Sequence, residues 1–248
     1  MSLSFKEQLS SAIFALPKYN VITYIDGFNL YFGIRAEATK RGSVEIPDPV
    51  WYRYMWLNLH AMCSLMLTDR QQLVAVKYFT APITGGKAKQ ERQNIYLDAL
   101  RTIPKIEIVF GRFEPERKLC EKCGHPGFHP QEKKTDVNIA TSLICDALDD
   151  KYDTAILVTG DSDIVPAVQA VRKLKPDKRI VAAFPPNRYS KELADSTNTK
   201  SPLRIWEPWL RKSRLDLIIK RSGLPDLVCP HKYTGQTGCT SEAKPKTT

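Results

Sequence analysis

The sequence predicts an α/β protein whose doubly wound parallel sheet lies between two layers of helices. Aliphatic stretches typical of buried strands alternate along the chain with segments of helical periodicity. Strands that alternate with helices pair in parallel and leave both faces of the sheet to helices, as in a Rossmann-type three-layer fold. The chain has 248 residues, of which 42% are hydrophobic, enough for one such core and a small appendage.

The strands and helices follow one another in a β-α-β-α-β succession. The predicted strands cover residues 21–25, 73–79, 106–110, 155–159 and 179–184. The predicted helices cover residues 30–38, 49–67, 87–101, 133–149, 164–174 and 188–194. Aromatic residues on more than one face of the helix over 49–67 favour core packing, with a stacking platform for bases as the alternative.

Acidic residues follow two of the predicted strands. The strand over 155–159 stops at Gly160, and Asp161 and Asp163 follow. Asp26 closes the strand over 21–25, with Asn29 three residues later. In open α/β sheets the carboxyl ends of the strands form the edge at which ligands bind. Ordinary acidic turns are the alternative, and Asn29 would either cap the next helix or support Asp26 by hydrogen bonding.

The helix over 133–149 adds a fourth acid. Thr135 is a natural N-cap, and a stripe of small and apolar residues predicts the face toward the sheet. Asp136 lies on that stripe in the first turn, whereas Asp146 is predicted on the outer face. The alternative role for Asp136 is complementarity to the helix dipole alone.

Four carboxylates at one edge have a specific chemical use. Their mutual repulsion favours a divalent cation, and Mg²⁺ or Mn²⁺ accepts such oxygen ligands while keeping several waters. One or two such ions can activate water against a phosphodiester and stabilise charge on the leaving oxygen. The sequence therefore predicts metal-dependent hydrolysis by Asp26, Asp136, Asp161 and Asp163, with Asn29 beside them.

A Cys/His segment interrupts the α/β pattern over residues 112–134, where no apolar repeat is visible and a loop insertion is expected. Its candidate zinc ligands are Cys120, Cys123, His125 and His129, because thiolate and imidazole groups at such spacing can hold a tetrahedral zinc. A reduced surface thiol pair and a redox pair are the alternatives. In the C-terminal segment, Cys229, His231 and Cys239 could complete or duplicate the site.

The charge favours a polyanionic partner such as RNA or DNA. The net charge is +10, and residues 200–248 carry ten lysines or arginines against four acidic residues. We expect a basic helical extension over 201–229 and a flexible tail over 230–248. Neither a membrane span nor a signal peptide is supported, so the cytoplasm is the expected compartment, and the six cysteines fit reduced thiols or a metal site.

Several motifs resemble those of the NYN domains, in particular the LabA-like bacterial branch of these PIN-like proteins. The resemblance covers about residues 19–200 and rests on YIDGFNLY (24–31), KTDVNIA (134–140), LVTGDSDIVPAV (157–168) and RIVAAFPP (179–186). It implies a doubly wound parallel sheet and Mg²⁺- or Mn²⁺-dependent cleavage of single-stranded or structured RNA. The shared acids would map onto Asp26, Asp136, Asp161 and Asp163.

Two other functions compete with RNA cleavage. Some bacterial proteins that this sequence resembles carry the name 6-hydroxy-3-succinoylpyridine 3-monooxygenase, an NADH-dependent step of nicotine degradation. The chain has no G-x-G-x-x-G after a strand, so its residues give that function little support. The third candidate is a non-catalytic RNA-binding module that uses the basic surface.

Overall fold

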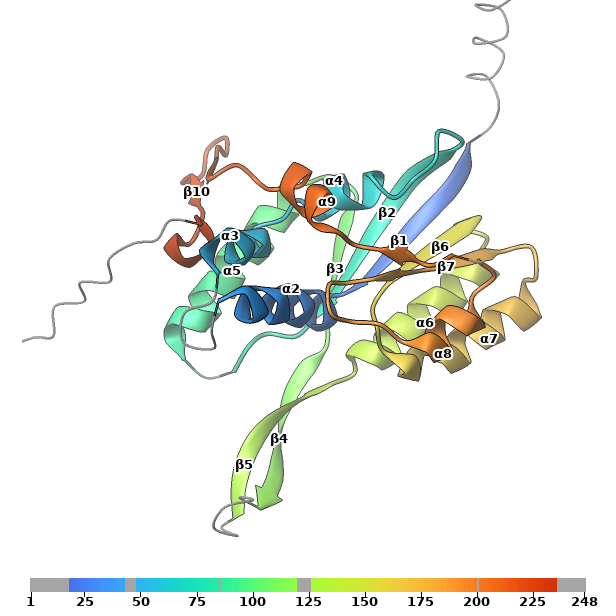
Figure 1. Cartoon of the computed structure of the whole chain (residues 1–248), viewed down its shortest axis with the longest axis horizontal. Helices are drawn as coiled ribbons and strands as arrows, with labels where there is room; N and C mark the ends of the chain where they lie inside the picture. Colours follow the sequence, from blue (N-terminus) through green and yellow to red (C-terminus); the bar gives the residue numbers. More distant parts are fainter. Residues whose placement is uncertain (1–17, 43–47, 85, 120–125, 200, 236–248) are drawn as a thin grey trace, which may run out of the picture.

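A six-stranded parallel sheet forms the centre of the computed structural model (Figure 1). The model describes residues 18–42, 48–84, 86–119, 126–199 and 201–235, with the backbone alone for 115–119 and 126–132. The strand order is β3-β2-β1-β6-β7-β8. These strands are β1 (Tyr19–Asp26), β2 (Gln71–Thr80), β3 (Ile106–Phe110), β6 (Thr154–Val158), β7 (Arg179–Phe184) and β8 (Leu203–Arg204).

Helices cover both faces of the sheet, which confirms the predicted three-layer fold (Figure 1). One face carries α2 (Gly27–Arg41), α3 (Pro49–Tyr52), α4 (Leu59–Ser64) and α5 (Lys87–Arg101). The other carries α6 (Thr135–Leu148), α7 (Val165–Leu174) and α8 (Lys191–Ser196). Alternate side chains of β1 serve the two cores: Val21 and Ile25 face the α2 side, whereas Ile22 and Tyr24 face the α6 side.

The direction of winding reverses between β1 and β6. The chain runs outward from β1 through β2 to β3, and then crosses to β6 on the other side of β1. Ile25 pairs with Val158 where these two strands end. A crevice at such a switch point is the usual ligand site of an open α/β sheet.

The predicted helix over 49–67 is broken into three pieces. A 3-10 turn, η1 (Arg53–Met55), follows α3, and at Trp56 (φ −108°, ψ 74°) the backbone leaves the helical region. The Asn58 side chain then accepts the Ala61 amide and begins α4. Trp51, Tyr52, Tyr54 and Trp56 are buried, as the core-packing interpretation predicted.

The segment predicted as a Cys/His loop contains an antiparallel ribbon of β4 (Arg112–Leu119) and β5 (Pro126–Lys133). The ribbon projects away from the sheet (Figure 1). A ribbon that leaves the body of a protein needs no hydrophobic alternation, so periodicity does not reveal it. The ribbon starts just after β3 and ends just before α6, so both of its ends lie at the carboxyl edge of the sheet.

Helix α6 differs from the prediction at two positions. Lys134, in the left-handed region with φ 77°, precedes the helix, so Thr135 is its first residue and not its N-cap. Asp146 is only 2% exposed, and the prediction that it lies on the outer face is wrong. Its carboxylate lies 2.6 Å from the Lys77 ammonium and accepts the Tyr24 hydroxyl at 2.8 Å. Polar side chains of β1 and β2 thus draw this acid toward the sheet.

The basic extension folds back onto the domain and contains only one short α-helix in its described part. Its elements after β8 are α9 (Glu207–Lys212), β9 (Ile218–Ile219), β10 (Leu227–Val228) and a 3-10 turn, η3 (His231–Tyr233). The Trp56 indole donates to the Asp216 carbonyl at 2.8 Å, which ties the extension to the helical layer. Tyr233 is buried, so the flexible tail predicted from residue 230 is wrong for 230–235, and residues 236–248 lie outside the described part.

No helix in the described part of the chain is long and apolar enough to cross a bilayer.

The helix predicted over 188–194 begins later, at Lys191, because the Ser190 hydroxyl accepts the Leu193 amide.

Candidate active site

Asp26 occupies the junction between β1 and α2. It is the last residue of β1 and the N-cap of α2, and its Oδ1 accepts the Asn29 amide at 2.9 Å. Its Oδ2 accepts the Thr159 hydroxyl at 3.2 Å, and the residue is only 5% exposed. The start of α2 therefore holds this carboxylate at the end of the central strand.

Thr159 joins the ends of β1 and β6. Its hydroxyl donates to Asp26 and accepts the backbone amide of Asp161 at 3.1 Å. Asp161 caps the 3-10 turn η2 (Ser162–Ile164), because its Oδ1 accepts the Asp163 amide at 3.0 Å. One buried hydroxyl thus links the carboxylate of Asp26 to the backbone that carries Asp161.

Asn29 fixes the same junction from the side of α2. Its Oδ1 accepts the Gly160 amide at 3.0 Å, across 131 residues of sequence. Asp26, and not Asn29, is therefore the cap of α2. The Asn29 backbone amide supports Asp26 by donating to its carboxylate, and the Asn29 side chain holds the β6 loop against the first turn of the helix. On the other side, Gly27 allows the start of α2 to approach β2, because a Cβ there would lie 2.7 Å from the Phe79 carbonyl oxygen.

The other two predicted acids reach the same edge from different elements. Asp136 is in the first turn of α6, which packs against η2, and Asp163 is exposed in η2 itself. Among the described residues, however, no three acidic, histidine or cysteine side chains converge to hold one metal ion. The four aspartates share an edge, but in the described part they do not form a ready-made ligand set.

The donor chemistry of Asp26 and Asp161 nevertheless fits Mg²⁺ or Mn²⁺. Mg²⁺ usually keeps several waters and is held by one or two carboxylates together with oxygens of a substrate phosphate. Two acids at adjacent strand ends meet that requirement without a closed cage. Asp136 and Asp163 lie on the neighbouring elements α6 and η2.

The predicted zinc ligands stay a prediction. Cys120, Cys123 and His125 lie outside the described residues, and only the backbone of His129, in β5, is described. In the C-terminal segment, burial raises the pKa of the Cys229 thiol to about 11, with Arg214 opposing this rise. Cys239 lies outside the described part as well.

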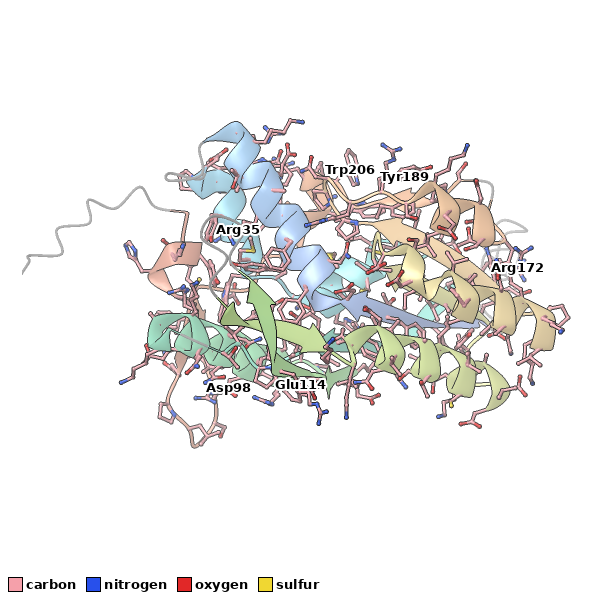
Figure 2. The ribbon with its side chains drawn as sticks, turned by 90° about the horizontal axis from the view of Figure 1, so that it is seen from below. Arg35, Asp98, Glu114, Arg172, Tyr189 and Trp206 are labelled. Atoms are coloured by element: carbon pink, nitrogen blue, oxygen red, sulfur yellow. The ribbon has the colours of Figure 1, made fainter. Side chains whose placement is uncertain are left out.

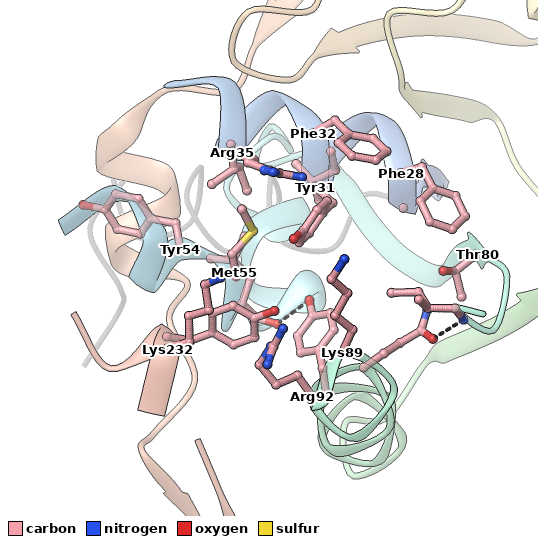
Figure 3. Close-up of a pocket in the computed structure, with 18 of the residues that line it drawn as sticks. Phe28, Tyr31, Phe32, Arg35, Tyr54, Met55, Thr80, Lys89, Arg92 and Lys232 are labelled. Carbon is pink, nitrogen blue, oxygen red and sulfur yellow. Dashed lines mark hydrogen bonds between the residues drawn. The ribbon is translucent and has the colours of Figure 1, made fainter. Parts of the chain in front are cut away.

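A cavity of about 350 Å³ adjoins the acidic edge (Figure 3). It lies between α2, α5 and η3, and Gly27 and Thr80 line the end next to β1 and β2. Tyr78 also lines it: burial raises the pKa of this phenol far above its ordinary value, and the charge of Asp26 adds to the rise. The Tyr78 hydroxyl lies against Gly27, the residue that follows Asp26. The sequence did not predict this cavity, because its walls come from six separate segments of the chain.

The ribbon of β4 and β5 stands over the same edge. Seen from below, it lies in front of the sheet, between α5 and α6 (Figure 2). Phe113 at its base packs edge-on against Phe28, with ring centroids 5.7 Å apart. Phe28 follows Asp26 by two residues, so the base of the ribbon borders both the acids and the cavity.

A doubly wound sheet with acids at its switch point defines an α/β protein with a candidate polar active site. The chain belongs to the NYN domain family, whose pattern matches residues 20–203. A curated relative, 6-hydroxy-3-succinoylpyridine 3-monooxygenase HspA of Pseudomonas putida, is 30% identical over 183 residues, which cover 60% of this chain and 54% of HspA. The match therefore spans about half the length of that relative.

One solved structure is also similar. A protein of unknown function from Vibrio parahaemolyticus aligns with a TM-score of 0.45 and 20% identity, over 80% of this chain and 97% of that chain.

Proposed function

We propose that this protein is a metal-dependent ribonuclease that hydrolyses RNA phosphodiester bonds at the carboxyl edge of its sheet. The observation that carries the proposal is the Thr159 hydroxyl, which ties Asp26 to the Asp161 loop at the switch point. Membership of the NYN family, with its PIN-like nuclease-type fold, supports the same reaction class. The LabA-like branch stays a prediction.

Each residue of the site would have its own role in the reaction. Asp26 and Asp161 would hold Mg²⁺ or Mn²⁺, with Asp136 and Asp163 available from α6 and η2. The cation, when bound, stabilises negative charge on the phosphate and lowers the pKa of a bound water. Asn29 and Thr159 keep the two strand ends in register. The net charge of +10 favours approach of a polyanion.

The direct test incubates the purified full chain with mixed RNA in Mn²⁺, in Mg²⁺ and in chelator. We expect loss of RNA with either cation and intact RNA with chelator, as followed by gel electrophoresis. RNA that stays intact under every metal contradicts the proposal. If such RNA is nevertheless retained on the protein, the non-catalytic binding module is the better description.

A second candidate is NADH-dependent hydroxylation of a pyridine. The name of the relative HspA and the aromatic cavity beside Asp26 favour it. The loop after β1 argues against this function, because its sequence is Asp-Gly-Phe-Asn-Leu and not the glycine-rich turn that holds a dinucleotide phosphate. NADH absorbance with 6-hydroxy-3-succinoylpyridine separates the two functions, since only the hydroxylase oxidises NADH.

A further inference from the structure

The cavity beside Asp26 has a lining suited to a planar ring. Tyrosine and phenylalanine side chains supply much of its wall, among them Phe28, Tyr31, Tyr52 and Tyr233. Burial raises the pKa of Tyr31 to about 12, with a further rise from Tyr52. Burial likewise raises the pKa of Tyr233 to about 12, with a further rise from Tyr31. Both phenols are therefore protonated at neutral pH and can donate a hydrogen bond to an anion.

Four cationic side chains enter the same cavity from three elements. Arg35 comes from α2, Lys89 and Arg92 come from α5, and Lys232 lies on η3 (Figure 3). No carboxylate is among the described residues that line the cavity, and none of these four cations forms an ion pair with a described carboxylate.

The cations are close enough to disfavour one another. Burial lowers the pKa of the Lys232 ammonium, and the charges of Arg92 and Arg35 lower it further. Lys232 also lies over the Tyr52 ring, with its nitrogen 4.9 Å from the centroid. A bound anion would offset this repulsion, whereas a neutral ligand would not.

We infer that this cavity binds a planar aromatic ring that carries a negatively charged group. The ring would pack among the tyrosine and phenylalanine side chains, and the anion would lie among Arg35, Arg92 and Lys232. The volume of about 350 Å³ lies within the range of about 300–1,000 Å³ that small-ligand sites occupy. An inorganic anion alone would leave the aromatic wall unfilled, and an uncharged ring would leave the cations unpaired.

Two sources share this chemistry. One is a mononucleotide or a nucleotide unit of RNA, whose base is the ring and whose phosphate is the anion. The other is a free aromatic carboxylate, such as the hydroxylated pyridine in the name of HspA. Because Gly27, Tyr78 and Thr80 place the cavity next to Asp26, either ligand would lie beside the acidic edge. The inference does not depend on RNA cleavage.

The test measures ligand binding to the metal-free full chain by calorimetry in chelator. The anionic ligands are uridine 5′-monophosphate and 6-hydroxy-3-succinoylpyridine, and the neutral counterparts are uridine and 2-hydroxypyridine. We expect at least one anionic ligand to bind about tenfold or more tightly than its neutral counterpart. The anionic ligand that binds more tightly than its neutral counterpart shows whether the cavity takes a nucleotide or an aromatic carboxylate.

Two variants connect the binding to the cavity. Arg35→Gln should weaken the anionic ligand about tenfold or more, and Phe28→Leu should weaken both members of the pair. Lys40→Gln, which removes an exposed cation from the same helix outside the cavity, should leave binding unchanged. Absence of binding by both anionic ligands, equal binding of charged and neutral ligands, or equal effects of Arg35→Gln and Lys40→Gln would each overturn the inference.

Discussion

Replacement of Asp26 by asparagine is expected to reduce RNA cleavage by about a hundredfold or more. Asn keeps an oxygen that can accept the Asn29 amide, so the cap of α2 can persist. What the variant loses is the negative charge at the end of β1. Both roles open to this carboxylate, holding a cation and activating water, require that charge.

The control for Asp26→Asn is Asp69→Asn. Asp69 is exposed in the turn before β2, at the amino end of the strands and so at the opposite edge of the sheet. We expect the Asp69→Asn variant to cleave RNA at the wild-type rate. Initial rates on one labelled RNA in Mn²⁺, with circular dichroism to verify folding, compare the variants. Equal rates for folded Asp26→Asn and Asp69→Asn would remove Asp26 from the proposed site.

Replacement of Asp146 by alanine is expected to lower the free energy of unfolding by about 3–5 kcal/mol, as loss of one partner from a buried ion pair does. The Lys77 side chain is only 13% exposed and has its ammonium 2.6 Å from this carboxylate. The variant would leave that ammonium with only the exposed Glu107 carboxylate, at 3.7 Å, and would leave the Tyr24 hydroxyl without its acceptor. Urea unfolding of the two proteins measures the difference.

Two comparisons make the Asp146 result specific. Asp149→Ala, which removes an exposed acid from the end of α6, should change stability by no more than about 0.5 kcal/mol. The double variant Lys77→Met, Asp146→Leu should be more stable than Asp146→Ala, since no buried charge is then left alone. If Asp146→Ala unfolds like Asp149→Ala, the ion pair contributes nothing.

The pH dependence has a definite sign. Burial opposes ionisation of Asp146, but hydrogen bonds from Lys77, Tyr24 and Lys151 outweigh it and hold the pKa below the ordinary value of 3.8. The stabilisation is therefore complete above that ordinary value, and it is lost as pH falls through the lower pKa of the folded state. Asp146→Ala should lack this acid-dependent part of the unfolding profile.

Local patterns in the sequence were sufficient to predict the sheet and the acids at its edge. Five of the six strands, all except the two-residue β8, contain a short aliphatic stretch followed by turn residues. Asp26 ends one of them, and Asp161 follows another within three residues. Because parallel strands align their carboxyl ends, chain order alone places both acids at one edge.

The features that the sequence did not predict depend on contacts between distant segments. Thr159 looks like the end of an aliphatic strand, and its role is visible only when β1 lies beside β6. Asp146 adjoins the stripe of the helix, and its charge alone favours an outward position, yet Lys77 and Tyr24 lie opposite it. The cavity requires η3, from a segment whose polar composition predicts a flexible tail.

The most direct test of the central claim, that Asp26 and Asp161 form one cation-dependent site, is calorimetric titration of Mn²⁺ into four proteins. These are the wild type, Asp26→Asn, Asp161→Asn and Asp69→Asn, all folded and free of RNA. We expect the wild type and Asp69→Asn to bind Mn²⁺ with equal affinity, and each of the other two variants to bind about tenfold or more weakly. Equal Mn²⁺ affinity in all four proteins, or no binding by the wild type, would contradict the claim.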